Sequence, residues 1–311
     1  MNGKIKIICV VGATASGKTA LGVALAKRLN GEIISADSMQ VYRDMPIATA
    51  AATVEEQEGV AHHLLGFLAP EEPFSVAAFV KLAKEAAIAI HERGKVPIVV
   101  GGTGLFVDSL VQNLTFSDVG ADEALREQFA KESTDALYER LLRVDPQAAS
   151  TIHKNNRKRV IRALELHYGG TGKTAQNEAS HNEESPFEAL YIQIDYRDRA
   201  KLYERINRRV DNMLAAGLED EARRMLSRTG VTARQAIGHK ELAPYIRGEI
   251  PLEEAVDNLK RETRHYAKRQ LTWFRRNTAM HTLYADEMSA DGLADSAAQL
   301  AAAFLKGERQ A

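Results

Sequence analysis

Hydrophobic runs alternate with helix-like periodicity along the first hundred residues of the chain. Short, mostly apolar runs predict strands of a buried parallel sheet at residues 5–11, 32–37, 95–100 and 190–195. Residues 19–29 and 76–93 lie between the first three runs and carry the 3.6-residue periodicity of helices. This alternation predicts an α/β fold in which ligands bind beyond the carboxyl ends of the strands.

After about residue 118 the pattern becomes predominantly helical. Helices are predicted at residues 122–142, 156–168, 202–215, 219–226 and 252–276. We therefore expect a sheet core accompanied by a helical part that is inserted discontinuously. The core is expected at residues 1–117, 150–200 and 262–311, and the helical insertion at residues 118–149 and 201–261. The polar, turn-rich residues 169–185 predict a loop.

The segment between the first predicted strand and helix matches the phosphate-binding P-loop pattern. It consists of Gly12, Ala13, Thr14, Ala15, Ser16, Gly17, Lys18 and Thr19. In such a loop, backbone N–H groups converge on an anion and the helix N-terminus adds partial positive charge. We expect Lys18 to reach terminal phosphate oxygens and the Thr19 hydroxyl to hold Mg²⁺. The core is therefore predicted to be P-loop NTPase-like, with Mg²⁺ as its cofactor.

Polar residues follow the next two predicted strands at the same edge of the sheet. The second strand ends in Asp37 and the third is followed by Gly101, Gly102 and Thr103. From its position, Asp37 is a candidate general base, a Mg²⁺ ligand through water, or a surface carboxylate that ends a strand. The Asp-Glu pair typical of P-loop ATP hydrolases follows none of the strands. This absence favours a kinase-like transferase or an enzyme that binds a different diphosphate.

Composition narrows the class of protein and its surroundings. Of the 311 residues, 45% are hydrophobic, enough for a sizeable core, and the single cysteine, Cys9, excludes an intrachain disulfide. A structural role for Cys9, as a small buried hydrophobic residue, is favoured. The sequence has no apolar run near the ~18 residues of a membrane span and no signal peptide. We expect a cytoplasmic protein that does not bind membranes.

The net charge is only −1, but the basic residues are segregated along the chain. Residues 154–162 hold five basic residues and no acidic one, and residues 261–276 hold six basic residues and one acidic residue. Such segments can form a positive groove for nucleic acid, or simply be solvated helix faces. His62, His63 and His239 lack the spacing of metal ligands, which favours structural roles.

The ordered motifs together resemble the bacterial tRNA dimethylallyltransferases, the tRNA isopentenyltransferase family. The resemblance extends from about Val10 to Arg276. It is carried by residues 12–19, 34–43, 62–64, 100–105, 159–165, 235–241 and 263–275. The chain departs from the family pattern at Ala13, at residues 48–53, at Phe106, at Lys158 and at His239. A P-loop alone would not separate this family from kinases, whereas the ordered set does.

The resemblance implies transfer of the dimethylallyl group from dimethylallyl diphosphate to N6 of the adenosine 3′ to the anticodon, with release of diphosphate. It implies that Asp37 is the general base and that Thr103 contacts the target adenosine or its phosphate, beside Lys18 and Thr19 as catalytic residues. Residues implied along the tRNA path are Asp37, Ser38, Met39, Gln40, Thr103, Arg126, Lys158, Arg159, Val160, Ile161 and Arg162. The expected partners are the anticodon stem-loop and dimethylallyl diphosphate, and we expect a monomer.

Two other functions stay open from the sequence. One is a small-molecule or nucleotide kinase that binds ATP at the P-loop beneath a helical lid carrying Arg205, Arg208 and Arg209. The other is a non-catalytic RNA-binding or nucleotide-gated protein, which would keep the basic helices but would not need Asp37.

Overall fold

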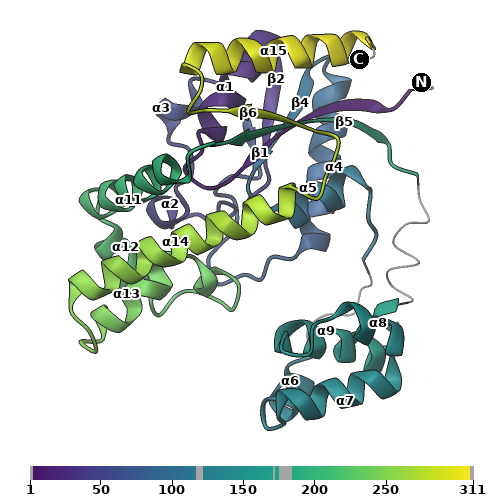
Figure 1. Cartoon of the computed structure of the whole chain (residues 1–311), viewed down its shortest axis with the longest axis vertical. Helices are drawn as coiled ribbons and strands as arrows, with labels where there is room; N and C mark the ends of the chain where they lie inside the picture. Colours follow the sequence, from purple (N-terminus) through teal and green to yellow (C-terminus); the bar gives the residue numbers. More distant parts are fainter. Residues whose placement is uncertain (1–2, 117–121, 171, 175–183, 309–311) are drawn as a thin grey trace. The chain divides into compact units, whose positions relative to one another are not determined.

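A computed structural model describes residues 3–116, 122–170, 172–174 and 184–308. The chain divides into two compact units, which are Met1–Val111 with Pro186–Ala311 and the intervening segment Gln112–Ser185 (Figure 1). This division differs from the expected one, because residues 150–185 belong to the intervening unit and residues 201–261 belong to the unit that contains the sheet. The expected boundary at residues 117–118 lies outside the described residues.

The first unit is built on a six-stranded sheet in the order β3-β2-β4-β1-β5-β6. The strands are β1 (Ile5–Gly12), β2 (Gly31–Ser35), β3 (His62–His63), β4 (Val96–Gly101), β5 (Phe187–Asp195) and β6 (Met280–Tyr284). Every neighbouring pair is parallel, and Val10 of the central β1 pairs with Val100 of β4 and Ile192 of β5. The predicted α/β fold with a parallel sheet is confirmed, and its strands end at one common edge.

Helices cover both faces of this sheet. Ile8 and Val10 pack in one cluster with α1 (Lys18–Leu29) and α15 (Ala290–Lys306). The opposite face is covered by α4 (Val76–Glu92), α5 (Gly104–Val111) and α14 (Leu252–Phe274), and Figure 1 shows the two layers on either side of the strands. Cys9 is fully buried beside Asp108 of α5, and burial raises the pKa of its thiol. The prediction that Cys9 is a buried core residue is confirmed.

The residues between β5 and β6 are helical but remain part of the first unit. They form α11 (Arg199–Ala215), α12 (Leu218–Met225), the short helix η1 (Ala233–Gln235), α13 (His239–Ile246) and α14. The long helix α14 joins two hydrophobic clusters, because Leu259 packs with α11, α12 and α13 while Ala267 and Leu271 pack with Ala13 of the P-loop. This continuous packing explains why residues 201–261 do not form a separate insertion. The first unit also contains α2 (Pro46–Thr49) and α3 (Val54–Gln57).

The second unit is a small helical bundle. The described residues include the helices α6 (Glu123–Ala130), α7 (Thr134–Val144), α8 (Pro146–Thr151) and α9 (Arg157–Tyr168). Phe129, Leu137 and Leu164 are fully buried in its core, so α9 belongs with α6 and α7. The single helix predicted at 122–142 is two helices, because the Ser133 Oγ caps α7 by accepting from the Ala136 N–H at 3.2 Å. Of the loop predicted at 169–185, residues 171 and 175–183 lie outside the described residues.

Candidate active site

The P-loop connects β1 to α1 at the carboxyl edge of the sheet. Ala15 and Gly17 have positive φ angles of 61° and 101°, which turn the backbone around the phosphate-binding position. A Cβ at Gly12 would overlap the Ile194 carbonyl oxygen of β5, so this position requires glycine. The buried Ser16 Oγ has no hydrogen-bond partner among the described residues. The loop therefore has the shape and the free polar groups that an anion requires.

Lys18 lies at the start of α1 and bends back over this loop, where its Nζ donates to the Ala13 carbonyl at 2.6 Å. Its side chain keeps some exposure, but the protein atoms around Nζ and the nearby Arg209 guanidinium lower the pKa of Lys18 to about 7, against a smaller opposing effect of Asp37. Burial also lowers the pKa of Arg209, which comes from α11. A bound anion would remove this repulsion, because it would be the counter-charge for both cations.

Asp37 and Thr103 lie together where β2 and β4 end. The Asp37 Oδ1 accepts from the Met39 N–H at 2.9 Å and the Gln40 N–H at 3.4 Å, which fixes the turn after β2. Thr103 joins the two loops, since its Oγ1 accepts from the Ser38 N–H at 3.1 Å and its N–H donates to the Ala36 carbonyl at 3.2 Å. The residues predicted to share one sheet edge are therefore adjacent, with Asp37 close enough to Lys18 to affect its pKa.

Sequence reasoning missed the contribution of α14 to this edge. The Gln270 Oε1 accepts from the Thr14 N–H at 2.8 Å, and its Nε2 donates to the Gly102 carbonyl at 3.0 Å. One turn earlier, Tyr266 lies beside Thr103 and Gln270, and burial together with the nearby Asp37 raises the pKa of its hydroxyl. The available signal was helical spacing, because Gln270 follows the buried Ala267 by three residues on the inner side of α14.

Comparison with known proteins distinguishes among the functions left open by the sequence. The IPP transferase family model matches residues 40–277, and an isopentenyl transferase model matches residues 5–66. The chain belongs to the IPP transferase family. A tRNA dimethylallyltransferase of Halalkalibacterium halodurans is 50% identical over 280 residues, which are 88% of each chain. One from Caldanaerobacter subterraneus is 45% identical over 294 residues, covering 91% of this chain and 93% of the relative.

Solved structures agree with this assignment. The full-length tRNA isopentenylpyrophosphate transferase from Bacillus halodurans matches with a TM-score of 0.74 and 43% identity, over 98% of both chains. A eukaryotic dimethylallyltransferase acting on tRNA matches with a TM-score of 0.81 and 28% identity, over 98% of this chain and 80% of the other. The resemblance predicted from the motifs is confirmed, and membership in this family argues against a generic P-loop kinase.

Two departures of this IPP transferase family member from the family pattern, His239 and residues 48–53, are linked through Glu221. His239 is buried with its Nε2 2.9 Å from the Glu221 Oε1, and the same carboxylate accepts from the N–H groups of Ile47 and Ala48, each at 2.8 Å. On the other side, the Gln40 Nε2 donates to the carbonyl of Ala50 at 3.1 Å and to that of Thr49 at 3.3 Å. Gln40 therefore holds the start of residues 48–53 in place with its own amide.

The residues predicted along the tRNA path in α6 and α9 differ in what they expose. Arg126 donates from Nε and Nη2 to the buried Glu165 at 2.5 and 3.2 Å, and Arg162 reaches the same carboxylate at 3.4 Å. Lys158 and Arg159 lie on the surface. At the two apolar positions, Val160 is fully buried in the helical core and Ile161 packs against it, and their place along the tRNA path stays a prediction.

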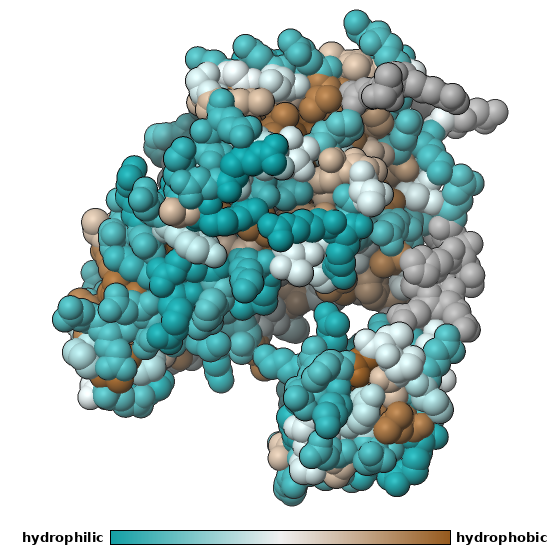
Figure 2. Space-filling view, viewed as in Figure 1, coloured by the Kyte–Doolittle hydropathy of each residue, from teal (hydrophilic) through white to brown (hydrophobic). Residues whose placement is uncertain are grey.

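The outer side of α14 carries a basic surface. Its exposed cations are Arg261, Lys268 and Arg269, and the exposed Arg275 and Arg276 follow directly after the helix. Figure 2 shows mostly hydrophilic side chains over α11 and α14. Arg276 stacks on Trp273 with its Cζ 4.0 Å from the ring centre, and the Trp273 Nε1 donates to Asp108 of α5 at 2.7 Å. One helix therefore presents cations outward and polar links inward.

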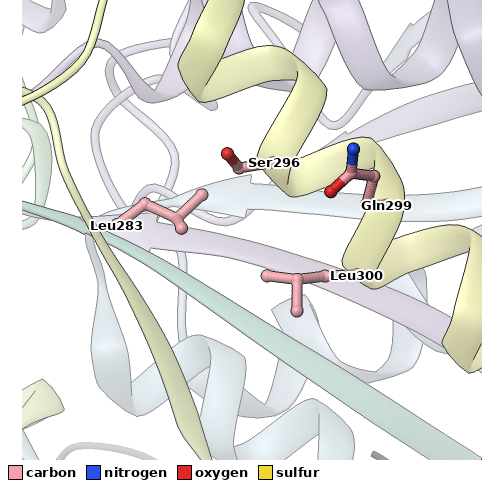
Figure 3. A pocket seen from close by; sticks show the side chains of 4 residues that line it. All are labelled: Leu283, Ser296, Gln299 and Leu300. Carbon is pink, nitrogen blue, oxygen red and sulfur yellow. The ribbon is translucent and has the colours of Figure 1, made fainter.

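Two pockets elsewhere in the first unit contain none of the predicted site residues. One, of about 330 Å³, lies between β6 and α15 and is lined by Leu283, Ser296, Gln299 and Leu300 (Figure 3). The other, of about 410 Å³, lies beside β5, β6 and the end of α14. Within the described residues, no group of three or more His, Cys, Asp or Glu side chains is arranged to hold a metal ion. No helix in the described part of the chain is long and apolar enough to cross a membrane.

Proposed function

We propose that this chain transfers the dimethylallyl group of dimethylallyl diphosphate to N6 of the adenosine 3′ to the anticodon of tRNA and releases diphosphate. The observation that carries the proposal is the meeting of the P-loop, Asp37 and Thr103 at one sheet edge of an IPP transferase family member. A phosphate cradle next to a carboxylate suits a reaction that breaks a carbon–diphosphate bond and removes a proton from an amine.

The P-loop side is proposed to bind the donor. Its backbone N–H groups, Lys18 and Arg209 would surround the diphosphate, while Arg205 supports the loop by donating from Nε to the Ala15 carbonyl at 3.0 Å. Because Lys18 has a pKa of about 7 without an anion, the donor's negative charge would hold it in its charged form. The charged Lys18 then stabilises the negative charge that develops on the leaving diphosphate.

The donor set at the start of α1 fits a hard cation such as Mg²⁺, which prefers oxygen ligands and substrate phosphates. Thr19 is the second residue of α1, and the buried Ser16 hydroxyl just before the helix has no hydrogen-bond partner among the described residues. We propose Thr19 as the protein ligand of Mg²⁺. When bound, the ion would neutralise charge on the diphosphate.

The opposite side of the edge is proposed to act on the adenosine. The exocyclic amine forms the new N6–C1 bond while the C1–O bond breaks, and the departing diphosphate takes the electron pair of that bond. The proton lost from N6 passes to the Asp37 carboxylate, whose Oδ1 is held by two backbone N–H groups while its Oδ2 accepts no hydrogen bond among the described residues. Thr103 is proposed to orient the acceptor, because its Oγ1 accepts from Ser38 and its own proton can be donated.

The RNA is proposed to bind through cations that hold its phosphates. Lys158 and Arg159 of α9 and the outer side of α14 supply exposed charge of the right sign. The target base has to leave the anticodon-loop stack to reach Asp37. That the protein acts as a cytoplasmic monomer stays a prediction from the sequence.

The test is transfer of label from radiolabelled dimethylallyl diphosphate to an anticodon stem-loop with adenosine 3′ to the anticodon, in the presence of Mg²⁺. We expect label on this RNA and none on a matched stem-loop with guanosine at that position. Absence of label on both RNAs, together with ATP consumption in the presence of a small acceptor, would overturn the proposal in favour of a kinase.

A further inference from the structure

We infer that Gln270 is a positioning residue that holds the donor-binding P-loop against the acceptor-binding loop after β4, an inference that rests on the proposed function. The two hydrogen bonds of its amide, to Thr14 and to Gly102, are called the lock below. The side chain is 5% exposed and spans the space between β1 and β4 at their carboxyl ends. It accepts from the Thr14 N–H of the P-loop at 2.8 Å and donates to the Gly102 carbonyl at 3.0 Å. One amide thus ties together two loops that are far apart in sequence.

The chemistry of these two links requires a neutral amide. Thr14 presents an N–H, so the group facing it has to accept a hydrogen bond. Gly102 presents a carbonyl, so the group facing it has to donate one. A carboxamide does both in a single orientation, whereas an ionised carboxylate can satisfy only the first link and an apolar side chain satisfies neither.

The surroundings of Gln270 keep the amide in this orientation. A Cβ at residue 102 would overlap the Gln270 Nε2, so glycine is what allows the helix to approach the loop. Tyr266 lies beside both Gln270 and Thr103. Farther along the same side of α14, the Trp273 Nε1 donates to Asp108 at 2.7 Å, which anchors the helix to α5. The lock is therefore buried, hydrogen-bonded at both ends and braced on each side.

The functional consequence follows from the placement of the reacting groups. The donor phosphates would lie against the P-loop, and the acceptor amine would lie near Asp37 and Thr103. The distance between the attacking N6 and the donor C1 depends on the separation of these two loops. A misplacement of about 1 Å can cost about a hundredfold in rate. Loosening the lock should therefore reduce the rate of the chemical step far more than the affinity for either substrate.

The test compares Gln270→Met, Gln270→Glu and the control Thr263→Val. Thr263 is also buried on α14, but its Oγ1 donates only within the helix, to Leu259 at 2.7 Å. With saturating donor and RNA, we expect Gln270→Met to lower the single-turnover rate about 30- to 100-fold and to change each dissociation constant less than about threefold. Thr263→Val should leave the rate within about threefold of wild type. A loss confined to binding, or an equal loss in the control, would overturn the inference.

The Gln270→Glu variant adds a signature that a merely structural role would not produce. When protonated, the introduced carboxyl group can donate to the Gly102 carbonyl, but when ionised it cannot. The rate of Gln270→Glu divided by the wild-type rate should therefore rise as the pH falls through the pKa of the introduced group. A ratio that does not change between about pH 5 and about pH 9 would contradict the proposed hydrogen bond.

Amide hydrogen exchange separates failure of the lock from failure of the proposed function. Gln270→Met should speed exchange in the peptides covering residues 12–17 and 100–104 together, and Thr263→Val should affect neither. If the wild-type protein modifies no RNA while both peptides respond, the lock stands and the proposed function falls. If both peptides exchange as in wild type, the lock is overturned regardless of activity.

Discussion

The carboxyl edge of the sheet and the surface of α9 both carry polar residues predicted to serve one reaction, yet they are constructed differently. At the sheet edge, the side chains of Asp37, Thr103 and Gln270 are each held by hydrogen bonds with backbone groups of the loops there. On α9, Lys158 and Arg159 extend from the surface of a helix whose inner side forms a separate core. The first arrangement fixes atoms in place, whereas the second offers charge that adapts to a flexible partner.

This contrast suggests a way to separate chemistry from binding in this protein. At the sheet edge, Asp37, Thr103 and Gln270 should control the rate at saturating substrate, and their effects should be insensitive to salt. Residues on the surface of α9 should control RNA affinity and its dependence on salt, because their contribution comes from displaced counterions. Variants that mix these effects would contradict the division.

The strongest effect is expected for Asp37→Asn. Asparagine keeps an Oδ1 that can accept from Met39 and Gln40, so the turn is preserved while the proton acceptor is lost. We expect the single-turnover rate to fall about a thousandfold, within the usual contribution of a general base, and dissociation constants for RNA and donor to change less than about threefold. Asp44→Asn, at an exposed carboxylate nearby, is the control, and normal turnover by Asp37→Asn would exclude the proposed base.

A weaker but still substantial effect is expected for Lys18→Met. Loss of one charged hydrogen bond to phosphate should weaken diphosphate binding about 10- to 100-fold. In the free protein the pKa of Lys18 is lowered to about 7, so above this pH the wild type has to take up a proton when it binds the anion. Wild-type affinity should therefore fall more steeply than that of Lys18→Met as the pH rises above about 7. Calorimetry in buffers of different ionisation enthalpy counts the protons, and equal uptake by both proteins would contradict this role.

A smaller effect is expected for the double variant Lys158→Ala/Arg159→Ala. We expect RNA affinity to fall about tenfold at about 0.1 M salt and the salt slope to decrease by about 2. The rate at saturating RNA should stay unchanged. Fluorescence anisotropy over a series of salt concentrations provides the measurement, with Lys27→Ala/Lys306→Ala as the control of equal charge. An unchanged slope would remove α9 from the proposed RNA surface.

The mildest effect is expected for Glu165→Gln. This carboxylate is buried, but its partners Arg126 and Arg162 keep about two-fifths of their side chains exposed, so solvent screens much of the attraction. We expect the helical unit to lose about 1 kcal/mol of stability. Exchange of the peptides covering α6 and α9 should speed up while the P-loop peptide stays unchanged. Equal acceleration in both units would show that they do not unfold independently.

The sequence predicted the parts of the site that are local in the chain. The P-loop is a contiguous motif, and Asp37 and Thr103 each follow an apolar run, so parallel strands were enough to bring them to one edge. The edge strands were missed, because His62–His63 is only two residues long and Met280–Tyr284 is half-buried throughout, so neither has the apolar run of a central strand.

The remaining parts depended on packing that no local pattern contains. Helical spacing places Gln270 on the inner side of α14, but only its contacts with Thr14 and Gly102 show what it joins. The division of the chain was misjudged for the same reason. Residues 201–261 have the periodicity of any amphipathic helix, and it is the packing of Leu202 and Ile206 in one cluster with Ala13 that joins them to the sheet unit.

The contact between α14 and the two loops also has a consequence for synthesis on the ribosome. Residues 12–19 emerge early, but Gln270, which accepts from Thr14 across 256 positions of the chain, emerges long afterwards. A nascent chain would therefore already carry its phosphate-binding motif while the reactive geometry was still missing, because contacts so distant in sequence form late. The enzyme would become competent only after α14 has emerged and packed against the two loops.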